Sequence, residues 1–249
     1  MESLFLLGFL LGMRHALEAD HVAAVSTIVA RGGGRSSRRL AFIGVSWGLG
    51  HTTTLFLVAV PVLLFGLMLS DGQMAGLEFL VGLMLVGLGI DVIRRLWRER
   101  IHIHVHEHGD GVRHVHFHSH AGEDVPHDHS PHDHLHPHEI VATAREGRMS
   151  LRAYLVGLMH GLAGSGALIA LAAAPAPSLG VAALYILLFG LGSSLGMGLL
   201  TWVISLPLSL ADRTARSLGA GIRLAAGFAS LLVGGVMIWE KGGELLALV

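Results

Sequence analysis

Residues Ser3–Ala30 read SLFLLGFLLGMRHALEADHVAAVSTIVA, an apolar run that five ionisable residues interrupt. A membrane-spanning helix needs about 20 residues, so this run is long enough to cross a bilayer. The rest of the chain has the same character: 52% of its 249 residues are hydrophobic, 14% are charged, and the mean hydropathy is +0.63. A soluble domain carries about a quarter charged residues. The composition therefore indicates an integral membrane protein.

Five further apolar stretches are long enough to span a bilayer. None alternates between polar and apolar residues over ten positions, which argues against a β-barrel. We therefore expect an all-α polytopic membrane protein with six transmembrane helices. The six stretches are Ser3–Ala30, Leu40–Leu69, Met74–Leu96, Leu151–Ala174, Leu179–Leu206 and Leu218–Trp239.

Arginine residues gather in alternate connections between these stretches. The connections after the first, third and fifth stretches are rich in Arg, whereas those near Asp71–Gln73 and Pro175–Ser178 contain neither Lys nor Arg. The positive-inside rule places the Arg-rich connections in the cytoplasm. We expect a multi-pass protein of the cytoplasmic membrane, in contact with the lipid bilayer and with both termini outside.

A polar insert, Ile101–His138, separates the third and fourth stretches and contains 14 of the 18 histidines. Histidine alternating with Asp, Pro and Gly cannot build a packed core, so we expect a largely disordered cytoplasmic loop. Closely spaced neutral imidazoles bind Ni²⁺, Co²⁺, Cu²⁺ or Zn²⁺. We interpret the loop as a metal buffer that can hand metal to a cytoplasmic metallochaperone; the alternative is a linker whose composition has drifted.

The two halves of the chain resemble each other in order. GMRHALEADH from Gly12 aligns with GLMHGLAGSG from Gly157, which pairs His15 with His160. GLGHTTT from Gly48 aligns with GLGSSLG from Gly190, and an LVG segment recurs in the third and sixth stretches. Three spans per repeat is an odd number, so the halves must enter the membrane in opposite directions. We expect two inverted three-helix repeats, residues 1–98 and 150–249, joined by the loop of residues 99–149.

Four histidines remain outside the insert and lie within expected spans: His15, His21, His51 and His160. Arg14, Glu18 and Asp20 accompany the first two. A charged side chain at the bilayer centre costs about 2.5–3.5 kcal/mol on insertion scales. These three groups must therefore pair with one another or bind something in a polar interior, and we expect Arg14 to be the charge partner of one carboxylate.

Helical geometry places Glu18 between His15 and His21, about 60° from each, with Asp20 about 160° away. Asp20 therefore requires a distorted helix, or it acts behind a ligating imidazole by accepting its far N–H. Imidazole and carboxylate ligands without Cys suit Ni²⁺, Co²⁺, Zn²⁺ or Mn²⁺ better than Cu⁺. The alternative is a set of buried, hydrogen-bonded residues that stabilises the bundle. The candidate metal ligands are His15, Glu18, Asp20, His21 and His51, with His160 as a further candidate.

Two motifs resemble those of nickel/cobalt permeases. RHALEADH at Arg14–His21 contains the H-x4-D-H pattern, and WGLGHTTTLF at Trp47–Phe56 is similar to that family's second histidine motif. GMRHALEADH, LMHGLAGSGA and YILLFGLG resemble the six-span branch associated with urease, so the resemblance covers all six spans. It implies nickel uptake, with His15, Asp20, His21 and His51 as the metal-selecting residues. Glu18 departs from the Asp more often found there, which leaves the metal open.

We interpret the protein as a permease, not an enzyme, that takes up Ni²⁺ and also Co²⁺; the metal is its cargo and no cofactor is implied. A proton-coupled efflux carrier is one alternative, and an intramembrane metal-dependent enzyme is another. The H-E-x-x-H motif of zinc proteases is absent. A serine protease using Ser165 lacks a later His as base. The net charge of −1 gives no indication of a nucleic-acid partner.

Overall fold

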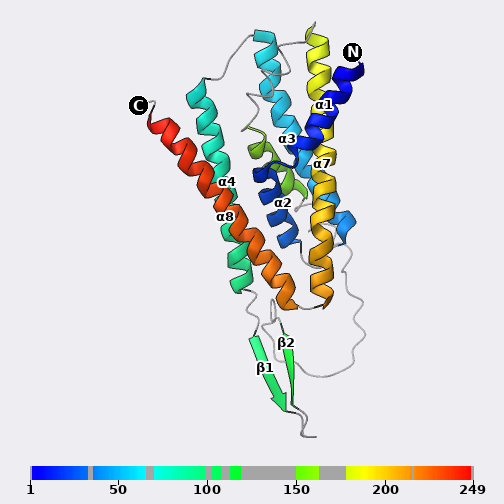
Figure 1. The fold of residues 1–249 in the computed structure, drawn as a ribbon, viewed down its shortest axis with the longest axis vertical. Coiled ribbons are helices and arrows are strands. Elements are labelled where there is room, and N and C mark those ends of the chain that lie inside the picture. The colour runs from blue at the N-terminus through cyan, green and yellow to red at the C-terminus, as the bar shows by residue number, and fades with distance from the viewer. Residues whose placement is uncertain are drawn as a thin grey trace.

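The computed structural model describes residues 2–32, 36–65, 70–98, 102–107, 113–118, 150–162, 178–214 and 216–247. The described chain forms a helical bundle with one small β-hairpin (Figure 1). Residues 150–160 are helical as well. The remaining helices are α1 Glu2–His15, α2 Ala19–Arg31, α3 Ser37–Phe65, α4 Asp71–Arg98, α7 Leu179–Thr214 and α8 Arg216–Leu246.

Among the described residues, four helices are long and apolar enough to cross a membrane, which confirms a helical membrane protein. The candidate spans lie in α3, α4, α7 and α8, where four of the expected stretches fall, although residues 66–69 of the second stretch lie outside the described residues. Large apolar side chains such as Phe42, Leu57 and Leu232 are exposed on these helices. Such a surface suits contact with lipid rather than water.

The first stretch is not one helix, contrary to the expectation, because it breaks between α1 and α2. At 1.5 Å per residue, the 14 and 13 residues of these helices extend about 21 and 20 Å, and each is shorter than the roughly 30 Å hydrocarbon core. In the break, the N–H groups of Leu17 and Glu18 donate to the carbonyls of Arg14 and His15. The two short helices can cross a bilayer only in series.

The polar side chains just after the break contact each other. Neighbouring side chains of a regular helix point about 100° apart. Here Asp20 Oδ1 accepts hydrogen bonds at 2.8 Å from both the backbone N–H and the ring Nδ1 of His21. The two neighbours therefore point to the same place in the bundle interior, which resolves the problem that an ideal helix poses for Asp20.

The helix of residues 150–160 begins the fourth expected stretch and gives way to a turn at Gly161 and Leu162. The rest of that stretch, including Ser165, lies outside the described residues. α3 packs along α7, and α4 packs along α8. α2 contacts both α7 and α8, and most of its side chains are buried (Figure 1). α2 is therefore an interior element, although it carries the most polar segment of the first stretch.

Several glycines of the described chain allow helices to approach within backbone contact, and the approach is tightest at four of them. At each of them an added Cβ would overlap a carbonyl group of the neighbouring helix. Small residues serve this purpose where membrane helices cross closely. The four pairs are Gly12 with Phe189, Gly192 with Phe9, Gly157 with Trp47 and Gly50 with Tyr154.

The β-hairpin lies at one end of the bundle and both chain termini at the other (Figure 1). β1, His102–Glu107, pairs antiparallel with β2, Arg113–His118, and His104 faces His116 in the register. This corrects the expected disorder for these two segments, where His alternates with Ile, Val or Phe and the period of two suits a strand. The remainder of Ile101–His138 lies outside the described residues.

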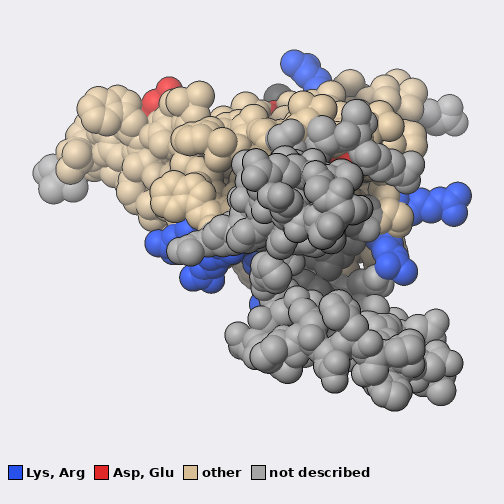
Figure 2. Space-filling view, turned by 90° about the horizontal axis from the view of Figure 1, so that it is seen from below, with Lys and Arg blue, Asp and Glu red and all other residues tan. Residues whose placement is uncertain are grey.

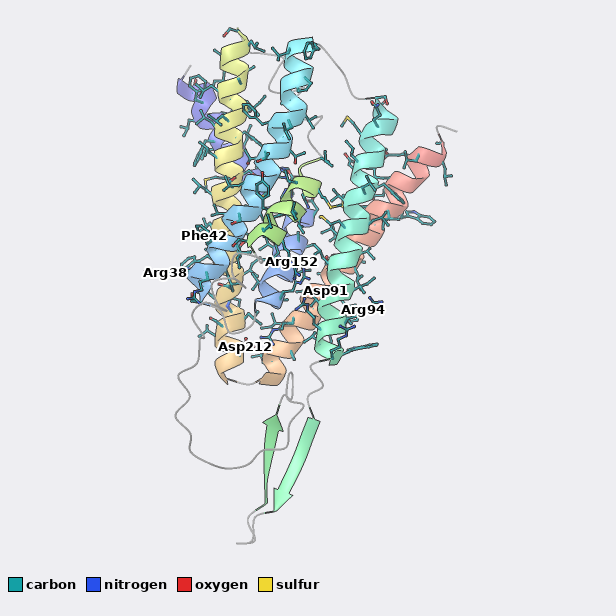
Figure 3. The ribbon with its side chains drawn as sticks, turned by 180° about the vertical axis from the view of Figure 1, so that it is seen from behind. Arg38, Phe42, Asp91, Arg94, Arg152 and Asp212 are labelled. Atoms are coloured by element: carbon teal, nitrogen blue, oxygen red, sulfur yellow. The ribbon has the colours of Figure 1, made fainter. Side chains whose placement is uncertain are left out.

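Basic side chains surround the hairpin end of the bundle, as the view from below shows (Figure 2). Arg38 and Arg94 lie towards this end (Figure 3). There the Asp91 Oδ2 atom accepts from Arg31 Nη2 at 2.7 Å and from Arg95 Nε at 2.8 Å. The ion pair of Arg31 with Asp91 ties the end of α2 to α4.

Replacing Gly157 by Ala should destabilise the bundle, because the new methyl group would overlap the carbonyl of Trp47. Overpacking of this kind costs about 1–3 kcal/mol, which corresponds to a fall in Tm of about 3–10 °C. Thermal unfolding of the purified protein in detergent measures the effect. Gly87→Ala is the matched control, because a Cβ at Gly87 has no atom within 4 Å. Equal Tm values for the two variants would contradict the close-approach argument.

Candidate metal centre

Four histidines from four helical segments meet inside the bundle. His15 ends α1, His21 lies in the first turns of α2, His51 lies in the middle of α3, and His160 ends the helix of residues 150–160. Their side chains are 5%, 1%, 0% and 1% exposed. These are the four histidines expected within spans, so the fold gathers into one cluster residues that are separated by up to 145 positions in the chain (15 to 160).

Three of these imidazoles form a tripod: His15, His21 and His51. The Nε2 atoms of His15 and His51 lie 3.2 Å apart, and one ligand atom from each of the three residues lies within 4.8 Å of the others. The His21 ring centroid is 4.4 Å from that of His15 and 5.2 Å from that of His51. A metal about 2.0–2.1 Å from each nitrogen in a tetrahedral site separates the nitrogens by about 3.3 Å. The tripod is therefore close to metal-binding geometry.

The Asp20 carboxylate joins the tripod to the fourth histidine. Its Oδ1 atom lies 2.8 Å from His21 Nδ1, and its Oδ2 atom lies 3.1 Å from His160 Nε2. The carboxylate is 22% exposed. Asp20, His21 and His160 form a second group whose ligand atoms all lie within 4.8 Å of one another. His160, a further candidate in the sequence, thus belongs to the cluster.

Glu18 occupies a different position from Asp20. Its Oε1 atom lies 3.0 Å from His15 Nδ1, but the orientation does not make a hydrogen bond, and its side chain is 57% exposed. Arg14 is exposed, and within the described part of the chain it forms no ion pair with either carboxylate. The expected pairing of Arg14 with a carboxylate is therefore replaced by contacts between the carboxylates and histidines.

Several ring nitrogens in the cluster are buried without a hydrogen-bond partner: His21 Nε2, His51 Nδ1 and His160 Nδ1. A buried polar atom left unsatisfied costs about 1–3 kcal/mol. A purely stabilising network, the alternative considered for these residues, would satisfy such atoms. The unpaired Nε2 atom of His21 instead favours a ligand-binding role for the tripod.

Two aromatic residues beside the cluster, Trp47 and Phe189, were not predicted from the sequence as part of the site. The Trp47 ring centroid lies 5.5 Å from that of His21 and 5.3 Å from that of His160, and the Phe189 ring lies 5.4 Å from His15. Each aromatic residue directly precedes a G-L-G segment, WGLGH in one half and FGLGS in the other. This shared position before G-L-G is the sequence feature that could have predicted both residues.

The cluster combines four buried imidazoles and one partly buried carboxylate. Neutral imidazole with carboxylate is a donor set for Ni²⁺, Co²⁺ or Zn²⁺, and a chain without Cys offers no thiolate for softer ions. The carboxylate supplies the negative charge and also orients two of the rings, as in the carboxylate–histidine pairs of metal sites. The arrangement can therefore hold a divalent transition-metal ion within the membrane interior.

Comparison with curated proteins finds the urease accessory protein UreH of Bacillus sp. (strain TB-90), which is 35% identical over 232 residues. The match covers 93% of this chain and 89% of UreH. The cobalt transport protein NhlF of Rhodococcus rhodochrous is 32% identical over 82 residues, which cover 31% of this chain and 22% of NhlF. No model of a known protein family and no solved structure matches the chain.

The two carboxylates should differ in their effect on metal binding. Asp20→Asn removes a charge that is hydrogen-bonded to two rings, and we expect the apparent Kd for Ni²⁺ to rise about 10–100-fold. Glu18→Gln removes an exposed charge that makes no hydrogen bond, and we expect a change below about fivefold. Quenching of Trp47 fluorescence by Ni²⁺ measures the occupancy, because this indole adjoins His21 and His160.

The histidine-rich insert also binds metal in this experiment, so its signal must be removed. Trp97, Trp202 and Trp239 supply the remaining fluorescence, and subtracting the response of a Trp47→Phe variant isolates that of Trp47. A Glu18→Gln variant that loses as much affinity as Asp20→Asn would refute the separate roles of the two carboxylates.

Proposed function

Since this chain belongs to the nickel/cobalt transporter family, together with the urease accessory protein UreH, we propose that it is a permease for Ni²⁺ that also accepts Co²⁺. Its curated relatives are a transport protein and an accessory protein, which agrees with the prediction of a non-enzyme. The metal is the substrate, and His15, His21 and His51 bind it while Asp20 supplies charge. The observation that carries this proposal is the buried imidazole tripod, with its unpaired nitrogens, inside a bundle of membrane-spanning helices.

Uptake is the proposed direction of transport. A divalent cation moving inward through 100 mV gains about 2 × 2.3 = 4.6 kcal/mol, which is more than a thousandfold accumulation at equilibrium. A proton-coupled efflux carrier is the second candidate, because Glu18, Asp20 and the histidines can exchange protons with a metal. Efflux would have to move more than two charges inward for each metal ion.

The proposed mechanism uses two inverted repeats, and the glycine contacts support this arrangement. The alignment of the two halves that pairs Gly12 with Gly157 also pairs Gly82 with Gly227 and Gly89 with Gly234. A Cβ added at Gly82 would meet the carbonyl of Gly234, and one added at Gly89 would meet the carbonyl of Gly227. The alignment therefore converts each of these two contacts into the other. The contacts favour this register over the pairing of the two LVG segments.

The crossing of α1 with α7 corresponds in the same way to the crossing of the helix of residues 150–160 with α3. Gly12 meets the carbonyl of Phe189, and Gly157 meets that of Trp47. Trp47 and Phe189 hold matching places before the two G-L-G segments. Two structurally equivalent halves of opposite orientation can rock about a site between them and expose it to each side of the membrane in turn.

The proposed topology puts the hairpin end in the cytoplasm and both termini outside. The Arg side chains around that end of the bundle support it under the positive-inside rule (Figure 2). In this orientation the histidine-rich insert receives metal after transport and serves as a cytoplasmic buffer. A metallochaperone is the partner that such a buffer would supply.

Uptake of radioactive Ni²⁺ into proteoliposomes with an imposed inside-negative potential tests the proposed function. His15→Ala, His21→Ala and His51→Ala should each reduce the initial rate at least tenfold, because each removes one of three ligands. Ser46→Ala is the matched control: Ser46 lies near His51 on α3, and its hydroxyl donates to the Phe42 carbonyl of the same helix.

The sign of the potential separates the two directions of transport. Accumulation that follows the inside-negative potential without a pH gradient supports uptake. Metal extrusion driven by a pH gradient would support the efflux alternative. Wild-type rates in all three histidine variants would refute the metal site itself.

Deleting Ile101–His138 should change how much metal cells retain, not which metal they take up. The insert contains 14 histidines, whereas the tripod lies in the helices. The Ni²⁺/Co²⁺ preference in competition uptake should stay within about twofold, while retention after a chelator wash should fall. A shifted preference in the deletion variant would argue against the buffer role.

A further inference from the structure

His21 lies between two histidines that hold corresponding positions in the two halves of the chain. Its ring centroid is 4.4 Å from that of His15 at an interplanar angle of 65°, and 4.3 Å from that of His160 at the same 65°. His15 is the fourth residue of GMRH and His160 the fourth of GLMH. The two flanking rings thus occupy equivalent positions in the two halves, as do the helices that carry them.

The surroundings of the two flanking histidines match as well. The His15 ring lies 5.4 Å from Phe189, and the His160 ring lies 5.3 Å from Trp47. In each case a histidine from one half packs against the aromatic residue that precedes the G-L-G segment of the other half. The two flanking histidines therefore have similar environments, one on each side of His21.

Each of these two environments has its own set of possible ligand atoms, and His21 belongs to both sets. One set is the tripod, and the other consists of Asp20, His21 and His160. His21 Nδ1 lies 2.8 Å from Asp20 Oδ1, which leaves the buried and unpaired Nε2 atom for the tripod. The two nitrogens of one imidazole point away from each other, so a single ring can serve two metal positions.

We propose that Asp20, His21 and His160 form a second metal position, and that transported metal passes to it from the tripod across the His21 ring. The atoms that would hold the ion are a carboxylate oxygen of Asp20, His21 Nδ1 and His160 Nε2. The separations from carboxylate oxygen to ring nitrogen in this group are 2.8 and 3.1 Å, near those expected between ligands of one ion. The role in transport rests on the proposed function, whereas the existence of the second position does not.

Transfer requires each imidazole to stay neutral and to change the nitrogen that carries its proton. When metal leaves the tripod for the second position, the proton of His21 moves from Nδ1 to the Nε2 atom that the metal has vacated. His160 moves its proton from Nε2 to Nδ1, a buried atom that has no hydrogen-bond partner. Asp20 exchanges two hydrogen bonds for a bond to the metal, and no net proton is released.

The absence of Cys from the chain allows a direct test. A single His160→Cys substitution in the full-length protein places one thiolate at the second position. Co²⁺ bound there gives a thiolate-to-metal charge-transfer band in the near ultraviolet, which Co²⁺ on the histidine-rich insert cannot give because the insert has no sulfur ligand. We expect the band in His160→Cys and in the tripod variant His15→Cys.

Ser230→Cys is the matched control, because Ser230 is fully buried and donates to the carbonyl of Leu85, where α4 packs on α8. This variant should show no charge-transfer band. A band in His15→Cys without one in His160→Cys, both from monodisperse protein, would overturn the second position. Absence of the band from both variants would overturn both metal positions.

A second variant separates a metal ligand from a residue that only positions Asp20. His160→Gln keeps an N–H donor for Asp20 Oδ2 but removes the ring nitrogen. We expect Ni²⁺ flux in proteoliposomes to fall at least tenfold while Ni²⁺ still quenches Trp47 fluorescence from the tripod. Wild-type flux in His160→Gln would show a positioning role and overturn the proposal. A charge-transfer band in His160→Cys combined with no flux in the wild type would instead refute transport and leave the second position standing.

Discussion

The Asp20 carboxylate connects the two halves of the molecule through its two oxygens. Oδ1 accepts from His21 in the first half, and Oδ2 lies at hydrogen-bond distance from His160 in the second. A carboxylate in a membrane interior is costly unless such partners surround it. The break between α1 and α2 lets His15 and Asp20 reach the same cluster, because a continuous helix would point them about 140° apart. The interior position of α2 and the meeting of the four histidines follow from that break.

The sequence predicts the membrane bundle and the cluster members because both depend on local patterns. Ionisable residues within an apolar run identify His15, Asp20 and His21, and removing the histidine-rich insert from the count leaves His51 and His160. The different environments of Glu18 and Asp20 could not be predicted. They depend on where the chain leaves the helix, and an ideal helix gives Glu18 the central place that the structure gives to Asp20.

Interhelical contacts are the part of the fold that a single sequence conceals. The glycines of GMRH and GLMH are visible in the sequence, but only the packed helices show that they face the carbonyls of Phe189 and Trp47. The aromatic rings that adjoin His15 and His160 follow from the same two crossings. The strands of the histidine-rich insert were missed for another reason: composition suggested disorder, whereas the alternation of His with apolar residues within β1 and β2 has a period of two.

The helix ends at the cluster also set the electrostatic field there. α1 ends at His15, and the helix of residues 150–160 ends at His160, so two helix C-termini reach the same site. Each C-terminus acts as roughly half a negative charge because the peptide dipoles of a helix add. The N-terminus of α2 contributes about half a positive charge, and Asp20 in its first turn offsets it. The three helix ends together therefore add about half a negative charge at the cluster, which favours cations over anions there.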